Sequence, residues 1–188
     1  MNKKVILDFP HNYTVEILDE TPSNYRGLHY YYPGARLNGG QDGLLLKISS
    51  DTPILWIGTF AKGIYTAKVV TGVFSMPNPE TVCVVSQGLG CIVSVHNPAS
   101  HEIVKESVIT GVMQIIDIGL IIFVGLTTIT AYDTSGIKWH TKQISWDNLE
   151  VIEVAPNMMK GKYWDMRSDS DKEFTVDMET GESVGGVE

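Results

Sequence analysis

The side chains best suited to chemistry, five histidines and two cysteines, follow no catalytic or metal-binding spacing in this sequence. His96 and His101 flank one turn and are near enough in sequence to approach each other, but a zinc site needs at least a third protein ligand. Neither a His-x-x-x-His nor a Cys-x-x-Cys motif occurs. Cys83 and Cys91 lie in neighbouring apolar segments, so we interpret both as buried small hydrophobic residues. These patterns predict a chain without a metal site.

Loops that bind phosphate or activate a nucleophile are also absent from the sequence. The glycine-rich stretch Gly34–Gly43 has neither the lysine nor the following helix that a phosphate-binding loop requires. No Gly-x-Ser-x-Gly elbow occurs. We therefore expect no cofactor and, as the leading hypothesis, no enzymatic activity.

A run of carboxylates in the last third of the chain is the first candidate for a binding surface. Asp165, Asp169, Asp171 and Glu173 follow one another closely, but the run lacks the central glycine of a calcium-binding loop and contains Lys172. We interpret it as a solvated hairpin loop. Further acidic residues in this region are Glu150, Glu153, Asp177, Glu179 and Glu182. Together these side chains predict a dense negative face that captures a basic protein.

The distribution of charge supports this choice of partner. Residues 1–100 carry seven basic and seven acidic residues, whereas residues 101–188 carry seven and fifteen, so the net charge of −8 belongs to the later half. A negative surface repels phosphate backbones, which argues against nucleic-acid binding. Opposite fields accelerate encounter, so a cationic partner is expected, although acidity also serves solubility alone.

Aromatic residues form a second candidate surface. Half of the eight tyrosines lie within eight positions, at Tyr25, Tyr30, Tyr31 and Tyr32. Tyrosine supplies a large contact area and a hydroxyl group, and such clusters are common at interfaces and sugar-binding surfaces. The alternative is that alternate tyrosines pack into a sheet while the others cover its outer face. We include Tyr30, Tyr31 and Tyr32 with Trp164 among the partner-binding residues.

The elements that must position these side chains are β-strands. One pattern occurs four times: an alternating apolar strand, a polar turn with Asp or Asn, and a second strand. Its copies are Leu44–Gly58, Cys91–Val104, Thr128–Thr141 and Glu173–Gly185. Such a repeat marks a stack of β-units, each unable to bury its apolar face alone. The sequence therefore predicts an all-β fold of about four small antiparallel sheets, with a β-sandwich plus an N-terminal β subdomain as the alternative.

The last three units begin at positions 72, 111 and 150, in steps of 39 residues. In the middle unit we expect strands over about 112–116, 120–124, 128–132 and 137–143, separated by turns such as Asp117–Gly119 and Asp133–Gly136. No amphipathic helix is expected. Residues 1–70 are less regular, so we predict an N-terminal β unit over 1–70 and three repeats over 71–188, which share a domain if their cores are continuous.

A family resemblance follows from the hairpin segments. The phrase AYDTSGIKWHTK, residues 131–142, resembles the hairpin between the third and fourth strands of quinoprotein-type and WD-type β-propeller blades, where an Asp turn, a Gly and a Trp recur. DMETGES, residues 177–183, lacks the Trp; SSDTPILW, residues 49–56, has Pro in place of Gly; VHNPASHEI, residues 95–103, keeps only an Asn. The resemblance implies a propeller-like architecture and specifies no function. Because there are only about four units and the first is irregular, we expect the array to be open or partial.

The location of the protein is a further expectation. The N-terminal segment has two lysines but no apolar stretch of the length of a secretory signal before Asp8 and Pro10, which favours the cytoplasm. The long apolar segment Val108–Tyr132 contains Gln114 and Asp117 and is interpreted as two core strands, so no membrane association is expected.

The leading functional hypothesis is a non-enzymatic module that binds a basic protein, in the manner of an acidic immunity protein that inhibits a toxin nuclease. A carbohydrate- or small-ligand-binding β-protein that uses Tyr30–Tyr32 and Trp164 is the first alternative. A propeller-type hydrolase or lyase, with His29, His96 or His140 paired with an acidic residue, is the second.

Overall fold

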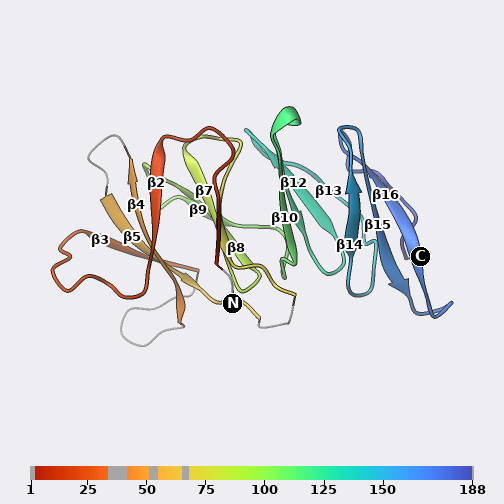
Figure 1. The fold of residues 1–188 in the computed structure, drawn as a ribbon, viewed down its shortest axis with the longest axis horizontal. Coiled ribbons are helices and arrows are strands. Elements are labelled where there is room, and N and C mark those ends of the chain that lie inside the picture. The colour runs from red at the N-terminus through yellow and green to blue at the C-terminus, as the bar shows by residue number, and fades with distance from the viewer. Residues whose placement is uncertain (1–2, 34–41, 51–54, 65–67, 188) are drawn as a thin grey trace. The chain divides into compact units, whose positions relative to one another are not determined.

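A computed structural model describes residues 3–33, 42–50, 55–64 and 68–187, and this part of the chain is almost entirely β-structure (Figure 1). Its strands form four small sheets, none of which closes on itself. The sole helical segment among the described residues is a single 3₁₀ turn, η1 (Ile116–Ile118). The predicted all-β, multi-sheet fold is therefore confirmed, and the described segments contain no amphipathic helix.

The first sheet has the order β2-β4-β5-β3. Its strands are β2 (Tyr13–Leu18), β3 (Leu28–Tyr32), β4 (Gly43–Ser50) and β5 (Leu55–Ala61). β4 pairs antiparallel with both neighbours, whereas β3 lies parallel to β5 at the edge. The turn expected at residues 51–53 and most of the glycine-rich stretch 34–43 lie outside the described residues.

The other three sheets are antiparallel meanders that follow the sequence repeat. The first has β6 (Gly72–Ser75), β7 (Thr81–Ser86), β8 (Leu89–Ser94) and β9 (His101–Ile103), with β1 (Lys4–Ile6) parallel to β6. The second has β10 (Gly111–Ile115), β11 (Leu120–Val124), β12 (Ile129–Asp133) and β13 (Gly136–His140). The third has β14 (Glu150–Val154), β15 (Met158–Asp165), β16 (Ser170–Asp177) and β17 (Ser183–Val184). Their first repeat strands begin at residues 72, 111 and 150, as the 39-residue step predicts.

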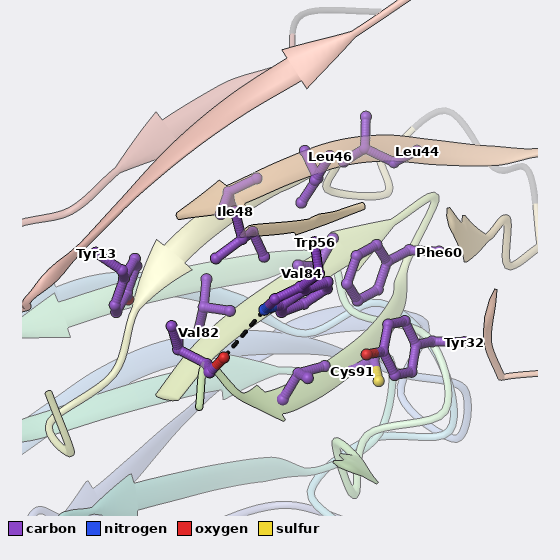
Figure 2. Close-up of a cluster of buried hydrophobic side chains, with 13 residues drawn as sticks. Tyr13, Tyr32, Leu44, Leu46, Ile48, Trp56, Phe60, Val82, Val84 and Cys91 are labelled. Atoms are coloured by element: carbon purple, nitrogen blue, oxygen red, sulfur yellow. Dashed lines mark hydrogen bonds between the residues drawn. The ribbon is translucent and has the colours of Figure 1, made fainter. Parts of the chain in front are cut away.

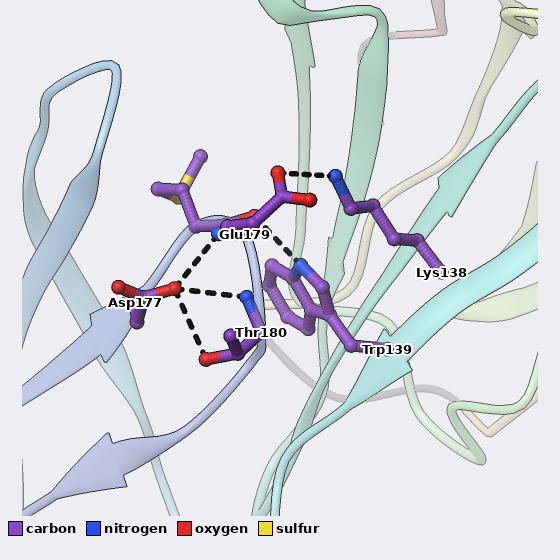
Figure 3. A network of polar contacts seen from close by, with 6 residues as sticks. Lys138, Trp139, Asp177, Glu179 and Thr180 are labelled. Atoms are coloured by element: carbon purple, nitrogen blue, oxygen red, sulfur yellow. Dashed lines mark hydrogen bonds and ion pairs between the residues drawn. The ribbon is translucent and has the colours of Figure 1, made fainter.

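Two of the predicted Asp turns are stabilised by hydrogen bonds to the aspartate carboxylate. Asp133 Oδ1 accepts hydrogen bonds from the Ser135 backbone N at 2.7 Å and from its Oγ at 2.6 Å. Asp177 Oδ1 likewise accepts from the backbone N atoms of Glu179, at 2.9 Å, and Thr180, at 2.8 Å (Figure 3). These hydrogen bonds stabilise the ionised carboxylates and lower the pKa of Asp133 and Asp177.

The chain divides into two compact units, residues 1–104 and 105–188. The sequence led us to expect a boundary near residue 70, but the contacts group residues 71–104 with the N-terminal residues. Each unit has its own buried apolar cluster. Figure 2 shows that of the first unit, built around Leu46, Trp56 and Val84. The cluster of the second unit includes Ile122, Trp139 and Phe174.

One tryptophan in each unit joins two sheets across one repeat. Trp56 Nε1 donates a hydrogen bond to the carbonyl of Val95 at 3.0 Å (Figure 2), and Trp139 Nε1 donates to the carbonyl of Met178 at 2.8 Å (Figure 3). In both cases the acceptor lies 39 residues after the tryptophan and directly after the third strand of the next repeat. The tryptophan that recurs in the sequence pattern therefore forms the same hydrogen bond between two sheets at both positions.

No helix among the described residues has both the length and the apolar character needed to cross a bilayer.

Candidate binding site on the C-terminal sheet

The sheet β14–β17 buries one face and exposes the other. Side chains alternate along β15, where Met159 and Tyr163 are buried and Trp164 is exposed. The same alternation on β16 buries Phe174 and Val176 in the core of the second unit. Because successive side chains of a strand point to opposite faces, the remaining residues of β15 and β16 form an outer face. We define this outer face by Glu150, Ile152, Glu153, Lys160, Lys162, Trp164, Asp171 and Glu173.

Two of the predicted partner-binding carboxylates lie on the outer face beside Trp164. In the antiparallel pairing of β15 with β16, Trp164 is opposite Asp171 and Lys162 is opposite Glu173. Directly opposite residues of an antiparallel pair project from the same side of the sheet. The structure therefore brings Trp164, Asp171 and Glu173 together, as the partner-binding hypothesis requires.

Lysines are interspersed among the carboxylates of the outer face, which the sequence did not lead us to expect. Lys162 Nζ lies 3.4 Å from Glu150 Oε2 and 3.5 Å from Asp171 Oδ2, and Lys160 Nζ lies 3.6 Å from Glu153 Oε2. Glu150 and then Asp171 raise the pKa of Lys162. The outer face holds four carboxylates and two ammonium groups, so it remains negative but less so than the acidic run suggests.

Asp165 lies on the other side of the sheet and is largely buried. Its Oδ2 accepts a hydrogen bond from Ser168 Oγ at 2.6 Å and lies 2.8 Å from Lys172 Nζ, while Oδ1 accepts from the Arg167 backbone N at 3.3 Å. The Lys172 ammonium and the Ser168 hydroxyl hold the pKa of Asp165 well below its usual range. Asp165 therefore stabilises the β15–β16 turn and does not contribute to the outer face. Asp169 lies in this turn, with a left-handed backbone at φ 53°.

The tyrosine cluster lies on β3, in the first unit, and alternates as a strand does. Tyr32 is buried, stacks on Phe60 and donates its hydroxyl to the carbonyl of Pro98 at 2.7 Å. Tyr30 is half-buried and meets Trp56 edge-on, at 5.8 Å between ring centroids. Tyr31 is half-buried on the other side of the strand, where it stacks on His29. Tyr32 is thus a core residue, and Tyr31 is the member of the predicted trio that projects from the opposite face.

A histidine and a carboxylate, His140 and Glu106, lie close together in the second unit. The buried Glu106, 3% exposed, accepts hydrogen bonds from Thr128 Oγ1 at 2.8 Å and Thr130 Oγ1 at 2.6 Å. His140 Nδ1 lies 2.7 Å from Thr130 Oγ1 and 3.5 Å from Glu106 Oε1. Burial lowers the pKa of His140, against the opposing effect of Glu106. The contacts of Glu106 therefore hold the segment that precedes β10 against strands β12 and β13.

His29 and the two cysteines are candidate groups of the first unit. His29 Nε2 is 2.8 Å from Thr59 Oγ1, and burial lowers its pKa. Cys83 and Cys91 are buried and unpaired, and burial raises the pKa of both thiols, that of Cys91 to about 12. Within the described residues, no three His, Cys, Asp or Glu side chains are placed to hold a metal ion.

Several surface residues near the outer face escaped sequence reasoning. Trp146 is 51% exposed, and Ile152 and Met166 are exposed to a similar degree. A signal for Trp146 was present in the sequence, because it lies in the polar segment KQISWDNLE between two strands. Nothing in the sequence separates the exposed Ile152 from the buried apolar residues of the neighbouring strands.

Comparison with known proteins gives a weak structural similarity. No family model and no curated protein matches the chain. The chain is similar to the crystal structure of the N-terminal domain of Nup159, with 11% identity and a TM-score of 0.41 over 98% of this chain and 53% of that chain. It is also similar to a chain in the S. cerevisiae structure of a Dbp5 variant bound to Nup159, a Gle1 variant, IP6 and ADP, with 9% identity and a TM-score of 0.32 over 99% of this chain and 70% of that chain.

The chain spans about half the length of the first of these structures. Because both TM-scores lie below 0.5, the similarities carry no argument about function. The propeller-like description rests on the four small sheets themselves, and no family model supports a WD-type or quinoprotein-type repeat.

Proposed function

We propose that this chain is a non-enzymatic protein-binding module and that it binds a basic partner protein through the outer face. The proposal rests on one observation: an exposed tryptophan lies on the same face of the sheet as several carboxylates. Trp164 is 43% exposed and Ile152 is 62% exposed, and the carboxylates of Glu150, Glu153, Asp171 and Glu173 share their face.

The outer face combines two exposed apolar side chains, Trp164 and Ile152, with charged side chains around them. Hot spots of protein interfaces are enriched in tryptophan, and a polar rim that excludes water surrounds them. Trp164 supplies such an anchor, and the charged residues around it supply the rim. The outer face also needs no rearrangement to be reached, because its side chains are already exposed.

Electrostatics favours a basic partner. The second unit carries seven basic and fourteen acidic residues, a net charge of −7, whereas the first unit carries −1. A field of this sign accelerates encounter with a cationic protein and disfavours acidic competitors. The inhibitor or immunity role suggested from the sequence remains a prediction within this class.

The test compares capture by charge variants. Immobilised wild-type protein, a D171K/E173K variant and a D117K/E80K control are incubated with lysate of the source organism, and the retained proteins are identified. The control carries the same total change of charge, and neither of its positions belongs to sheet β14–β17. We expect a partner with a basic isoelectric point that wild type and control retain and that D171K/E173K loses.

The identified partner is then purified and its dissociation constant is measured against salt and against W164A. Rim charges act mainly on the association rate and are screened by salt, whereas loss of the anchor accelerates dissociation. A partner that is not basic, or one whose binding is unchanged in D171K/E173K and W164A, would refute the proposal.

A further inference from the structure

A pocket of about 290 Å³ lies beside the β15–β16 turn, on the side of the sheet away from the outer face. Its wall includes Trp146, Tyr163, Asp165, Arg167, Ser168 and Lys172. All of these side chains except Trp146 come from the end of β15, the β15–β16 turn and the start of β16. Tyr163 is fixed by the hydrogen bond from its hydroxyl to the carbonyl of Gly186 at 2.9 Å. The volume is at the lower end of the range for small-molecule sites and suits a single ring.

The pocket is locally positive in a negative unit. Its charged residues are Arg167, Lys172 and Asp165, and the second unit as a whole carries −7. Lys172 and Asp165 neutralise each other at 2.8 Å. Within the described residues the Arg167 guanidinium has no ion pair, so one positive charge remains for a ligand. Arginine binds carboxylates through two parallel hydrogen bonds, which gives it selectivity for that group.

An exposed indole forms another part of the wall. Trp146 also lines a second hollow, of about 320 Å³, together with Trp164 and Met166. A half-exposed tryptophan at the rim of a pocket provides a flat apolar surface against which a ring stacks.

We propose that this pocket binds an acidic sugar, with the ring on Trp146, the carboxylate on Arg167 and hydroxyl groups on Ser168 and Asp165. A neutral sugar would leave the charge of Arg167 uncompensated. A compact polyanion such as phosphate would bring its charge close to the Asp165 carboxylate, which forms part of the wall. An acidic sugar combines one negative charge with hydroxyl donors, which match the Asp165 acceptor. None of the residues that line this pocket belongs to the outer face defined above, so the two proposals rest on different side chains.

Titration followed by saturation-transfer NMR and by tryptophan fluorescence tests the proposal. The probes are D-glucuronic acid, D-glucose as the neutral analogue of the same size, and inorganic phosphate. We expect saturable binding of glucuronic acid, with glucose and phosphate at least about tenfold weaker, because only glucuronic acid offers both a single carboxylate to Arg167 and hydroxyl donors to Asp165.

Variants separate the contributions of charge and ring. R167A should weaken glucuronic acid about tenfold and leave glucose unchanged, R167K should be intermediate, and W146A should weaken both sugars. D171K/E173K, which alters the outer face, should bind glucuronic acid as wild type does, so the two proposals fail independently. Absence of glucuronic acid binding, equal binding of phosphate, or equal affinity in R167A and wild type would overturn the proposal. Thermal unfolding of R167A and R167K at the wild-type temperature shows that the exposed turn has kept its fold.

Discussion

Substitution of Trp139 by phenylalanine tests whether the inter-sheet tryptophan bond stabilises the second unit. Trp139 is 5% exposed, and its Nε1 donates to the carbonyl of Met178 at 2.8 Å. Phenylalanine keeps an aromatic ring in the core but removes the donor, which leaves a carbonyl without this partner in a buried segment. An unsatisfied buried group costs about 1–3 kcal/mol, and the smaller ring adds a packing loss, so we expect W139F to lose about 2–3 kcal/mol of unfolding free energy.

Urea unfolding followed by far-UV circular dichroism measures this loss. With a urea dependence of about 1–3 kcal/mol per molar, the midpoint should fall by roughly 1 M or more. The matched control is W146F, a change of the same chemistry at a half-exposed tryptophan, which should change the unfolding free energy by less than about 0.5 kcal/mol. If the two units unfold in separate transitions, W139F should move one transition and W56F, which makes the equivalent change in the first unit, the other.

Equal midpoints for W139F and W146F would refute the reasoning. The recurring tryptophan would then contribute nothing through its N–H group, and the repeat would be stabilised by apolar packing alone. A fall in both transitions for W139F would show instead that the stabilities of the two units are coupled.

Three further predictions concern groups inside the units. G125A should destabilise the second unit by about 1–3 kcal/mol, because the added Cβ would overlap Glu106 Oε2 and displace that carboxylate from its threonine partners; an unchanged melting temperature would contradict this. Cys83 and Cys91 should not react with Ellman's reagent at pH 8 in the native protein but should react in denaturant, because burial raises the pKa of both thiols; rapid native reaction would count against their buried placement. The folded-state pKa of His140 is below its usual 6.5, so the stability it contributes is present above pH 6.5 and is lost as pH falls through the folded-state value. H140Q should therefore flatten the acid limb of a stability–pH profile, and a gain of stability from His140 on acidification would show that attraction to Glu106 outweighs burial.

Local sequence signals predicted the repeated sheets well. β11 spans the expected Leu120–Val124, and the other strands of the second meander lie within one to three residues of the expected limits. The reason is that alternation of apolar residues and the chemistry of Asp and Gly turns act within a few residues of the chain. The turn at Asp133 illustrates this, since its carboxylate is bound by the backbone only two residues later.

Pairings between distant segments had no such signal. β1 joins β6 across more than sixty residues, and β3 adds to β5 in parallel rather than to β2, its predecessor in the chain. Hydrogen bonds of a sheet edge are the same for any strand of suitable length, so the choice depends on which apolar faces can be buried together. The grouping of residues 71–104 with the N-terminal sheet has the same origin, because the first core cluster draws on Trp56 and Val84 together.

The candidate site shows the same division between local and tertiary information. The sequence by itself determined that the acidic run lies on a hairpin, that Trp164 stands next to it and that the later half of the chain is negative. Only the tertiary structure decided that Asp171 and Glu173 share a face with Trp164, while Asp165 turns inward to Lys172. Side-chain alternation fixes which residues are on opposite sides of a strand, but burial against a neighbouring sheet fixes which of the two sides faces water.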